Sequence, residues 1–145
     1  MADFVFNIAK GRVAELAALA AANDAIVLIP IETSGLESDA TLRDYDTVAA
    51  LLAASNNEQS TMGRKTLASV TVTVDDSNDR VDVDAADVTW PAATGNAISK
   101  LITAFDLDTT GGTDANLVPL TAHDFVVTPD GSDVVATIAN FFRAS

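Results

Sequence analysis

The chain contains no cysteine, which excludes disulfides, thiolate catalysis and cysteine-ligated zinc sites. Its single histidine, His123, excludes a zinc site built from several histidines and a proton relay between two imidazoles. One Trp and one Tyr give little support for the aromatic platforms that a glycosidase would need. No apolar run reaches the ~20 residues of a bilayer span, and the N-terminus lacks a basic region followed by a long apolar run. We therefore expect a soluble protein without a signal peptide.

Basic residues are also few, with 8 Lys and Arg against 21 Asp and Glu, a formal net charge of −13. Such a charge repels phosphate backbones and anionic lipid surfaces, so we expect neither nucleic acid nor a membrane as partner. Basic or neutral protein surfaces and cations are the favoured partners. The alternative is that the charge only keeps an abundant protein soluble.

With 145 residues, of which 48% are hydrophobic, the chain has the size of one domain and can bury a real core. We predict a single compact domain over residues 1–145. Within residues 1–8, Phe4-Val5-Phe6-Asn7-Ile8 is expected to form either a short strand or an extended arm.

The fold is organised around the apolar stretch Ala97–Leu107, bounded by turn-forming residues on both sides and predicted to be a central strand. The spacing of Ile98, Leu101, Ile102 and Phe105 also fits one helical face, so a buried helix is the alternative. Ala25–Ile31 is predicted to be a strand buried on both faces, with Pro30 at an edge or a strand end.

Helices are predicted over Ala9–Ala22, from its Ala, Leu, Glu, Lys and Arg content, and from Ser38 or Asp39 to Ser55, from its apolar face. The polar run Ser55–Thr61 is predicted to be an exposed, mobile linker. These elements place two helices in the first half of the chain.

Alternation predicts a hairpin from Val70–Val74 and Arg80–Asp84, and Val88–Trp90 is predicted to be a short strand stopped by Pro91. A second hairpin is predicted around Pro129–Ser132, joining His123–Thr128 to Asp133–Ile138. The fold class is therefore α+β: a largely antiparallel sheet with two helices packed on one face.

No recognisable reactive site emerges. Asp106–Gly111 resembles the opening of a calcium loop, but Leu117 stands where the closing Glu belongs, so an acidic surface loop is the better interpretation. His123 beside Asp124 is half a triad without an activated serine motif. The locally basic Gly63–Thr66 only mimics the end of a phosphate loop. We predict no enzyme activity, no catalytic residue, no cofactor and no metal.

Three stretches carry a resemblance to a known family: MADFVFNIAKGRVAEL, SGLESDATLRDYDTVAALLAASNNEQSTMGRK and DTTGGTDANLVPLTAHDFVVTPDGSDVVATIANFFRAS. In them the chain resembles small structural proteins encoded by tailed bacteriophages of actinobacteria. The resemblance covers most of the chain, although none of the three is a functional motif. It departs at Leu16–Ala22, where the relatives carry bulkier side chains.

The resemblance implies a non-enzymatic virion structural protein that decorates or cements the capsid exterior. Its implied partners are the major capsid protein lattice and further copies of itself, and its implied location is the capsid surface of the virion, with the host cytoplasm during assembly. A tail or head–tail component and a soluble small-ligand binding module are the alternatives. Aromatic residues near the termini are candidate partner contacts, unless they close their own core: Phe4, Phe6, Phe141 and Phe142.

Overall fold

The computed structural model describes residues 2–145 and shows a mixed, sheet-rich protein with antiparallel sheets. The largest sheet has five strands in the order β1-β8-β7-β2-β3. Their bounds are Phe4–Val5 (β1), Val118–Val127 (β8), Ile98–Asp106 (β7), Ala25–Glu32 (β2) and Lys65–Thr66 (β3). The helices are short, so the expected α+β class agrees with this architecture only loosely.

The central strand is β7, as predicted for Ala97–Leu107, and the helical alternative is wrong. It pairs with β2 on one side and β8 on the other, and its residues from Ile98 to Ala104 are all buried. Pro30 was predicted at an edge or a strand end, but it lies inside β2, two residues before its end, and β2 is an interior strand of the sheet. The Pro30 carbonyl accepts a hydrogen bond from the Gln59 N–H, 2.9 Å away, on the side of β2 where the short β3 has already ended. No ladder bond is lost at the proline.

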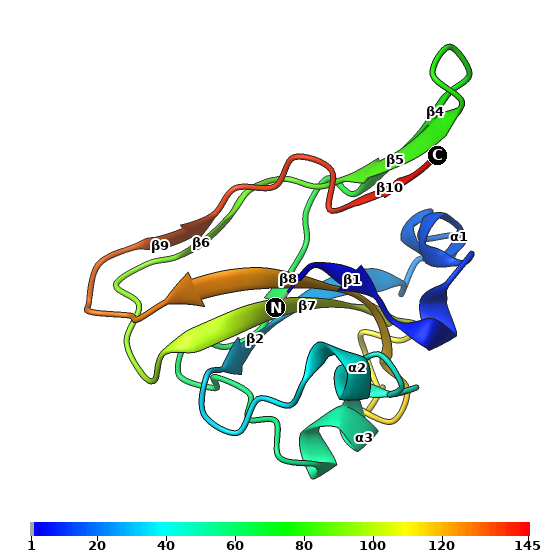
Figure 1. Cartoon of the computed structure of the whole chain (residues 1–145). Helices are drawn as coiled ribbons and strands as arrows, with labels where there is room; N and C mark the ends of the chain where they lie inside the picture. Colours follow the sequence, from blue (N-terminus) through cyan, green and yellow to red (C-terminus); the bar gives the residue numbers. More distant parts are fainter. Residues whose placement is uncertain (1) are drawn as a thin grey trace.

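Two smaller sheets lie over one face of the five-stranded sheet, and α2 and α3 lie on the other (Figure 1). One is the ribbon of β6 (Val88–Trp90) and β9 (Val134–Ala136). The other, which we call the projecting sheet, consists of β4 (Thr71–Asp75), β5 (Arg80–Asp84) and β10 (Phe142–Ala144), and its hairpin end points away from the body. The predicted hairpin of β4 and β5 is confirmed.

The helix predicted over Ala9–Ala22 is much shorter than expected. Only α1 (Val13–Ala17) and a 3-10 turn at Asn7–Ala9 form. Gly11 (φ +77°) and Leu19 (φ +48°) adopt left-handed backbone conformations, which a continuous right-handed helix cannot accommodate. Helix propensity is overridden at both positions.

The helix predicted from Ser38 or Asp39 to Ser55 is two helices, α2 (Asp39–Leu42) and α3 (Val48–Ala53). Ser38 caps α2 as expected, accepting a hydrogen bond from the Thr41 N–H. The break arises because Thr47 is the N-cap of a second helix: its hydroxyl accepts a hydrogen bond from the Ala50 N–H at 3.1 Å.

The predicted exposed linker Ser55–Thr61 is instead anchored. Asn56 and Gln59 are only 2% and 1% exposed. The Asn56 amide donates to the Leu51 carbonyl and to Glu37, and the Gln59 amide donates to the Asn96 carbonyl at 2.8 Å. Buried amides of this kind must be hydrogen-bonded, and here they fasten the segment to the body.

The hairpin predicted around Pro129–Ser132 is wrong, although Gly131 has a positive φ of +94°, as a turn glycine can. β8 pairs with β7 and β1, whereas β9 pairs with β6 in another sheet. The connection is held by Ala93, which donates to the Ser132 carbonyl and accepts from the Gly131 N–H, both at 2.8 Å. The chain therefore passes from the five-stranded sheet to another sheet at a point where the turn residues predict a hairpin within one sheet.

One buried apolar cluster contains residues from all three sheets and from all three α-helices, from Phe4 to Phe141. Within residues 2–145, no helix has both the length and the apolar character needed to cross a bilayer.

Candidate functional site

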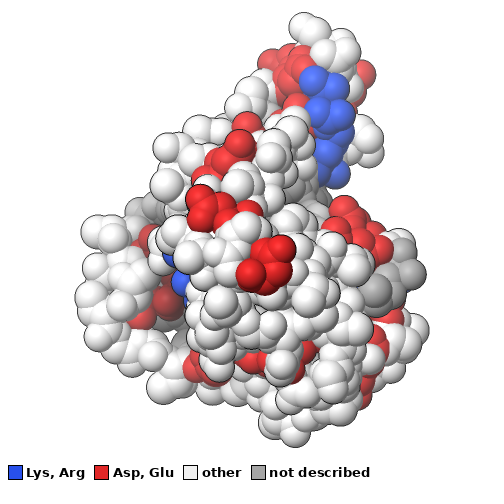
Figure 2. Space-filling view, turned by 90° about the vertical axis from the view of Figure 1, so that its left-hand side faces the viewer, with Lys and Arg blue, Asp and Glu red and all other residues white. Residues whose placement is uncertain are grey.

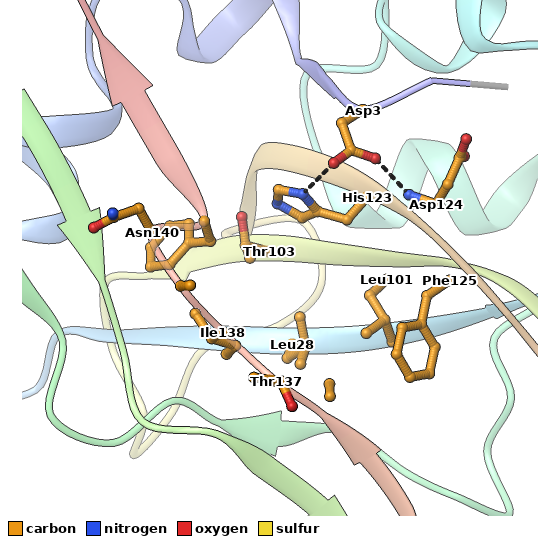
Figure 3. Close-up of a pocket in the computed structure, with 13 residues that line it drawn as sticks. Asp3, Leu28, Leu101, Thr103, His123, Asp124, Phe125, Thr137, Ile138 and Asn140 are labelled. Atoms are coloured by element: carbon orange, nitrogen blue, oxygen red, sulfur yellow. Dashed lines mark hydrogen bonds and ion pairs between the residues drawn. The ribbon is translucent and has the colours of Figure 1, made fainter.

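A cleft of about 320 Å³ lies between the five-stranded sheet and the segment Thr137–Phe141, which crosses above it. We call Thr137–Phe141 the crossing segment. Leu28 of β2, Leu101 of β7 and Phe125 of β8 form the apolar floor, and Ile138 faces them from above (Figure 3). The cleft is thus walled by parts of the chain that lie more than 100 residues apart.

One end of the cleft carries a hydrogen-bonded row of polar side chains, of which Figure 3 labels Asp3, His123 and Thr103. His123 Nδ1 lies 3.3 Å from Asp3 Oδ2, and His123 Nε2 lies 2.8 Å from the Thr121 hydroxyl. The Thr121 hydroxyl in turn contacts that of Thr103. Because the ionised Asp3 can only accept, the proton of a neutral His123 belongs on Nδ1, and Nε2 accepts from Thr121.

The order Asp3–His123–Thr121 resembles that of a catalytic triad, but the threonine in the position of the nucleophile is buried. Thr121 is 2% exposed, and its hydroxyl is already engaged by His123 and Thr103. Asp3 Oδ1 also accepts from the Asp124 N–H at 2.7 Å. The row therefore holds the N-terminal residues against β8.

Lys100 lies in β7 with its side chain on the opposite face of the sheet, and it is 0% exposed. Its Nζ lies 2.6 Å from Asp124 Oδ1 and 3.1 Å from Asp39 Oδ1, and donates to the Ala2 carbonyl at 3.3 Å. It also lies 5.2 Å from the centre of the Phe4 ring. A fully buried ammonium requires such compensation.

The pKa of Asp39 is lowered from its ordinary value of 3.8. Desolvation is the largest influence and raises the pKa, but the hydrogen bond from the Ala2 N–H and the hydrogen bond and charge of Lys100 together outweigh it. The ionised carboxylate is thus the form that the fold stabilises at Asp39.

Of the predicted partner contacts, Phe4, Phe6 and Phe141 are buried in the protein's own core, with 8%, 0% and 8% exposure. Phe142 is half-buried against the same core. Phe4, Phe6 and Phe141 thus belong to the protein's own core, as in the alternative interpretation, whereas part of Phe142 remains at the surface.

The acidic loop after β7 uses its carboxylates within the loop. Asp106 accepts from the Asp108 N–H, and Asp108 accepts from the N–H and hydroxyl of Thr110. The Thr110 contacts hold the pKa of Asp108 below its usual range. The part of the chain that the structure describes contains no group of three or more His, Cys, Asp or Glu placed to hold a metal ion.

The basic character expected at Gly63–Thr66 is neutralised, because Arg64 is held between two carboxylates. Its guanidinium donates to Glu58 at 2.6 and 2.8 Å and to Asp114 at 2.6 and 3.0 Å. The hydrogen bonds that Arg64 donates to Glu58 and then to Asp114 raise the pKa of Arg64. This doubly paired arginine fastens the loop after α3 to the loop before β8.

The projecting sheet has one apolar and one polar face. Val72 and Val74 of β4 lie opposite Val83 and Val81 of β5, so these valines share a face. Val83 is buried, whereas Val74, toward the hairpin end, is 66% exposed. The apolar face therefore extends beyond the body that covers its base.

The polar face of the projecting sheet carries its two basic residues, Arg80 and Arg143, and Figure 2 shows basic atoms gathered along this part of the molecule. Arg143 forms a bidentate pair with Asp82, and Arg80 lies 3.2 Å from both Asp75 and Asp82. The hydrogen bond from Arg143 is the main reason that the pKa of Asp82 is lowered.

Sequence reasoning found His123 but paired it with Asp124, whereas the structure pairs it with Asp3. It missed Lys100 altogether. Neighbouring residues of a strand point to opposite faces, so His123 and Asp124 could not share a site once this segment was taken as a strand. No local pattern indicates the partners of Lys100, because Asp39 is 61 positions away.

No protein-family model, curated protein or solved structure matches the chain.

Proposed function

We propose that this protein is a non-enzymatic structural component of a tailed-bacteriophage virion that decorates or cements the capsid exterior. The three stretches that resemble small structural proteins of actinobacterial phages support this function. The finer assignment of the fold, to an α+β class in which the helices expected within residues 9–22 and 38–55 pack on one face of the sheet, belongs to the same proposal.

The observation that carries the proposal is the projecting sheet. Its hairpin end extends away from the body, and its apolar face leaves Val74 66% exposed (Figure 1). Exposed apolar surface on an extension supports contact with another protein more than it supports stability of the chain itself. The proposed partner is the assembled lattice of the major capsid protein, which engages the protein on the virion surface after assembly in the host cytoplasm.

The acidic composition is compatible with such a role. A net charge of −13 keeps free copies apart and away from packaged DNA. A lattice binder also gains from multivalency, because weak contacts per copy suffice when neighbouring copies reinforce one another.

The test is cosedimentation of purified protein with pre-assembled capsids and, separately, with isolated capsid subunits. We expect much stronger binding to the capsids, with Val74→Ser reducing occupancy. Val126→Ser is the matched control, because Val126 is 77% exposed but lies on β8, outside the projecting sheet. Equal binding to free subunits argues against lattice recognition, and absence of the protein from purified virions refutes the proposal. Recovery with the tail fraction instead supports a tail or head–tail component.

A soluble small-ligand binding module is the second candidate, and the cleft of about 320 Å³ favours it. Its floor combines residues of β2 and β7, the two segments that would line an apolar pocket. Saturable binding of an apolar fluorescent dye, abolished by the cleft-filling substitution Ile138→Trp, would support this candidate. Unsaturable or absent dye binding would count against it.

A further inference from the structure

Strand β4 has an outer edge with no neighbour. It pairs only with β5, over its full length of five residues and without a register shift. Its sequence, Thr71-Val-Thr-Val-Asp75, contains no Lys, Pro or Gly. A free edge displays unpaired N–H and C=O groups, and natural proteins usually blunt such edges with those residues, with bulges or by keeping the strand short.

The other sheet edges in residues 2–145 are blunted in these ways. β1 and β3 have two residues each, and β6, β9 and β10 have three each. β1 pairs with the centre of β8. Further along the same edge of β8, the Asp124 N–H is already used in a hydrogen bond to Asp3. β4 is therefore the longest uncovered edge that the structure describes.

We propose that β4 is a self-association site, at which it pairs antiparallel with β4 of a second copy around a two-fold axis at Thr73. In this register Thr73 faces Thr73 of the second copy, Val72 faces Val74, and Thr71 faces Asp75. The two projecting sheets then form one continuous six-stranded sheet.

The placement of charge favours this register over one centred on Asp75. On the polar face, each Asp75 lies between Arg80 of its own copy and the uncharged Thr71 of the second copy, so no carboxylate directly faces another across the seam. Shifting the two-fold axis to Asp75 would place two carboxylates opposite each other, which destabilises a strand pair. Threonines opposite each other at the centre can hydrogen-bond.

The apolar face of the projecting sheet also favours a second copy of the chain as the partner of β4. Val74 is 66% exposed in the single copy, and pairing places Val72 of the second copy beside it. The valines of the two copies then form an unbroken apolar strip across the seam. A second copy matches this strip because its strand has the same alternation of valine and threonine.

A five-residue strand pair covers far less than the ~800 Å² per partner of a standard stable interface, so the dimer is weak. Mutual repulsion between two chains of charge −13 weakens it further at low salt. Self-association should therefore strengthen as salt is raised. The inference is independent of the proposed function, because it is tested without capsids.

The absence of cysteine allows a direct test by crosslinking. Directly opposed residues in an antiparallel pair have Cα atoms about 4.5–5.5 Å apart, which lies within disulfide range. Under mild oxidation we expect Thr73→Cys to form a covalent dimer. Thr71→Cys alone should crosslink at least tenfold more slowly, whereas a mixture of Thr71→Cys with Asp75→Cys should crosslink efficiently.

Charge substitution gives a second test, read by sedimentation velocity over a concentration series. Thr73→Lys places like charges opposite each other and should weaken association at least tenfold. Mixing it with Thr73→Glu should restore association, because residue 73 then faces an opposite charge. Thr89→Lys is the matched control, since Thr89 is an exposed strand residue outside the projecting sheet and the charge change is the same.

The inference is overturned if Thr73→Cys crosslinks no faster than Thr89→Cys. It is also overturned if the wild-type protein remains monomeric at millimolar concentration and high salt. Dimerisation that Thr73→Lys leaves unchanged would place the interface elsewhere and refute it as well.

Discussion

Lys100 offers the sharpest test of how this fold tolerates a charge in its centre. The ammonium is 0% exposed, whereas the side chains of its partners Asp39 and Asp124 are 19% and 32% exposed. Removal of a carboxylate leaves a fully buried ammonium with one partner fewer, whereas removal of the lysine leaves carboxylates on partly exposed side chains. We therefore predict that Asp124→Ala is more destabilising than Lys100→Met.

The magnitudes follow from this asymmetry. Breaking a buried ion pair by removing one partner costs about 3–5 kcal/mol. For Asp124→Ala we expect the lower end, about 3 kcal/mol, because Asp39 and the Ala2 carbonyl remain within 3.1 and 3.3 Å of Nζ. Lys100→Met keeps the apolar stem and leaves only partly exposed carboxylates behind, so it should cost less than Asp124→Ala. Asp124→Asn, which keeps an acceptor without the charge, should fall between them.

Urea unfolding with linear extrapolation measures these differences, provided that the slope of the free energy against urea stays constant. For a chain of this size the Asp124→Ala loss corresponds to a fall in melting temperature of about 6 °C or more. A larger loss for Lys100→Met than for Asp124→Ala would refute the reasoning.

The same experiment has a pH dependence of defined sign. The pKa of Asp39 is lowered in the fold, so its contribution is present above pH 3.8 and is lost as the pH falls through the folded-state pKa. Lys100→Met removes one cause of that lowering. The difference in unfolding free energy between wild type and Lys100→Met should therefore shrink between about pH 5 and about pH 2. A constant difference over this range would contradict the assigned ion pair.

The remaining predictions concern two glycines and the acidic loop. Gly131→Ala should destabilise by about 1 kcal/mol from backbone strain alone, because φ is +94° but nothing lies within 4 Å of the position that an alanine methyl group would take. Gly95→Ala should cost at least about 1 kcal/mol more in the same urea assay, since its Cβ would approach the buried Gln59 side chain as well as adopt a φ of +114°; equal losses would contradict this. Calorimetry with calcium should give no stoichiometric heat, because Asp106 and Asp108 already cap their own loop, and a submillimolar titration would refute that interpretation.

The parts of the fold that were predictable are those in which hydrophobic pattern alone decides the outcome. β2 is an apolar run buried on both faces, β7 is a largely apolar segment bounded by turn residues, and β4 and β5 alternate strictly. For β7, where the spacing also fitted a helix, its short length and the turn residues at both ends favoured the strand. The path after Pro129 was not predictable, because the same turn residues suit a hairpin and a crossover, and the distant Ala93 selects the crossover.

The helices failed for a related reason. Propensity predicted long helices, but a Thr cap at Thr47 and left-handed backbone at Gly11 and Leu19 ended them early. Both signals are local and were visible only as single residues within helix-favouring runs. Tertiary contacts such as the Asn7 N–H to the Arg43 carbonyl at 2.9 Å then fix the irregular path.

Strand alternation also explains how one short N-terminal segment closes both faces of the sheet. On one face, Ala2 donates to Asp39 at 2.8 Å and accepts from Lys100. On the other face, Asp3 accepts from His123 at the end of the cleft. Deleting these residues would therefore undo the ionic network and the cleft together, so a terminal truncation cannot separate loss of binding from loss of folding. Substitutions on the projecting sheet avoid this difficulty, because Thr73 and Val74 are exposed and lie outside the buried apolar cluster.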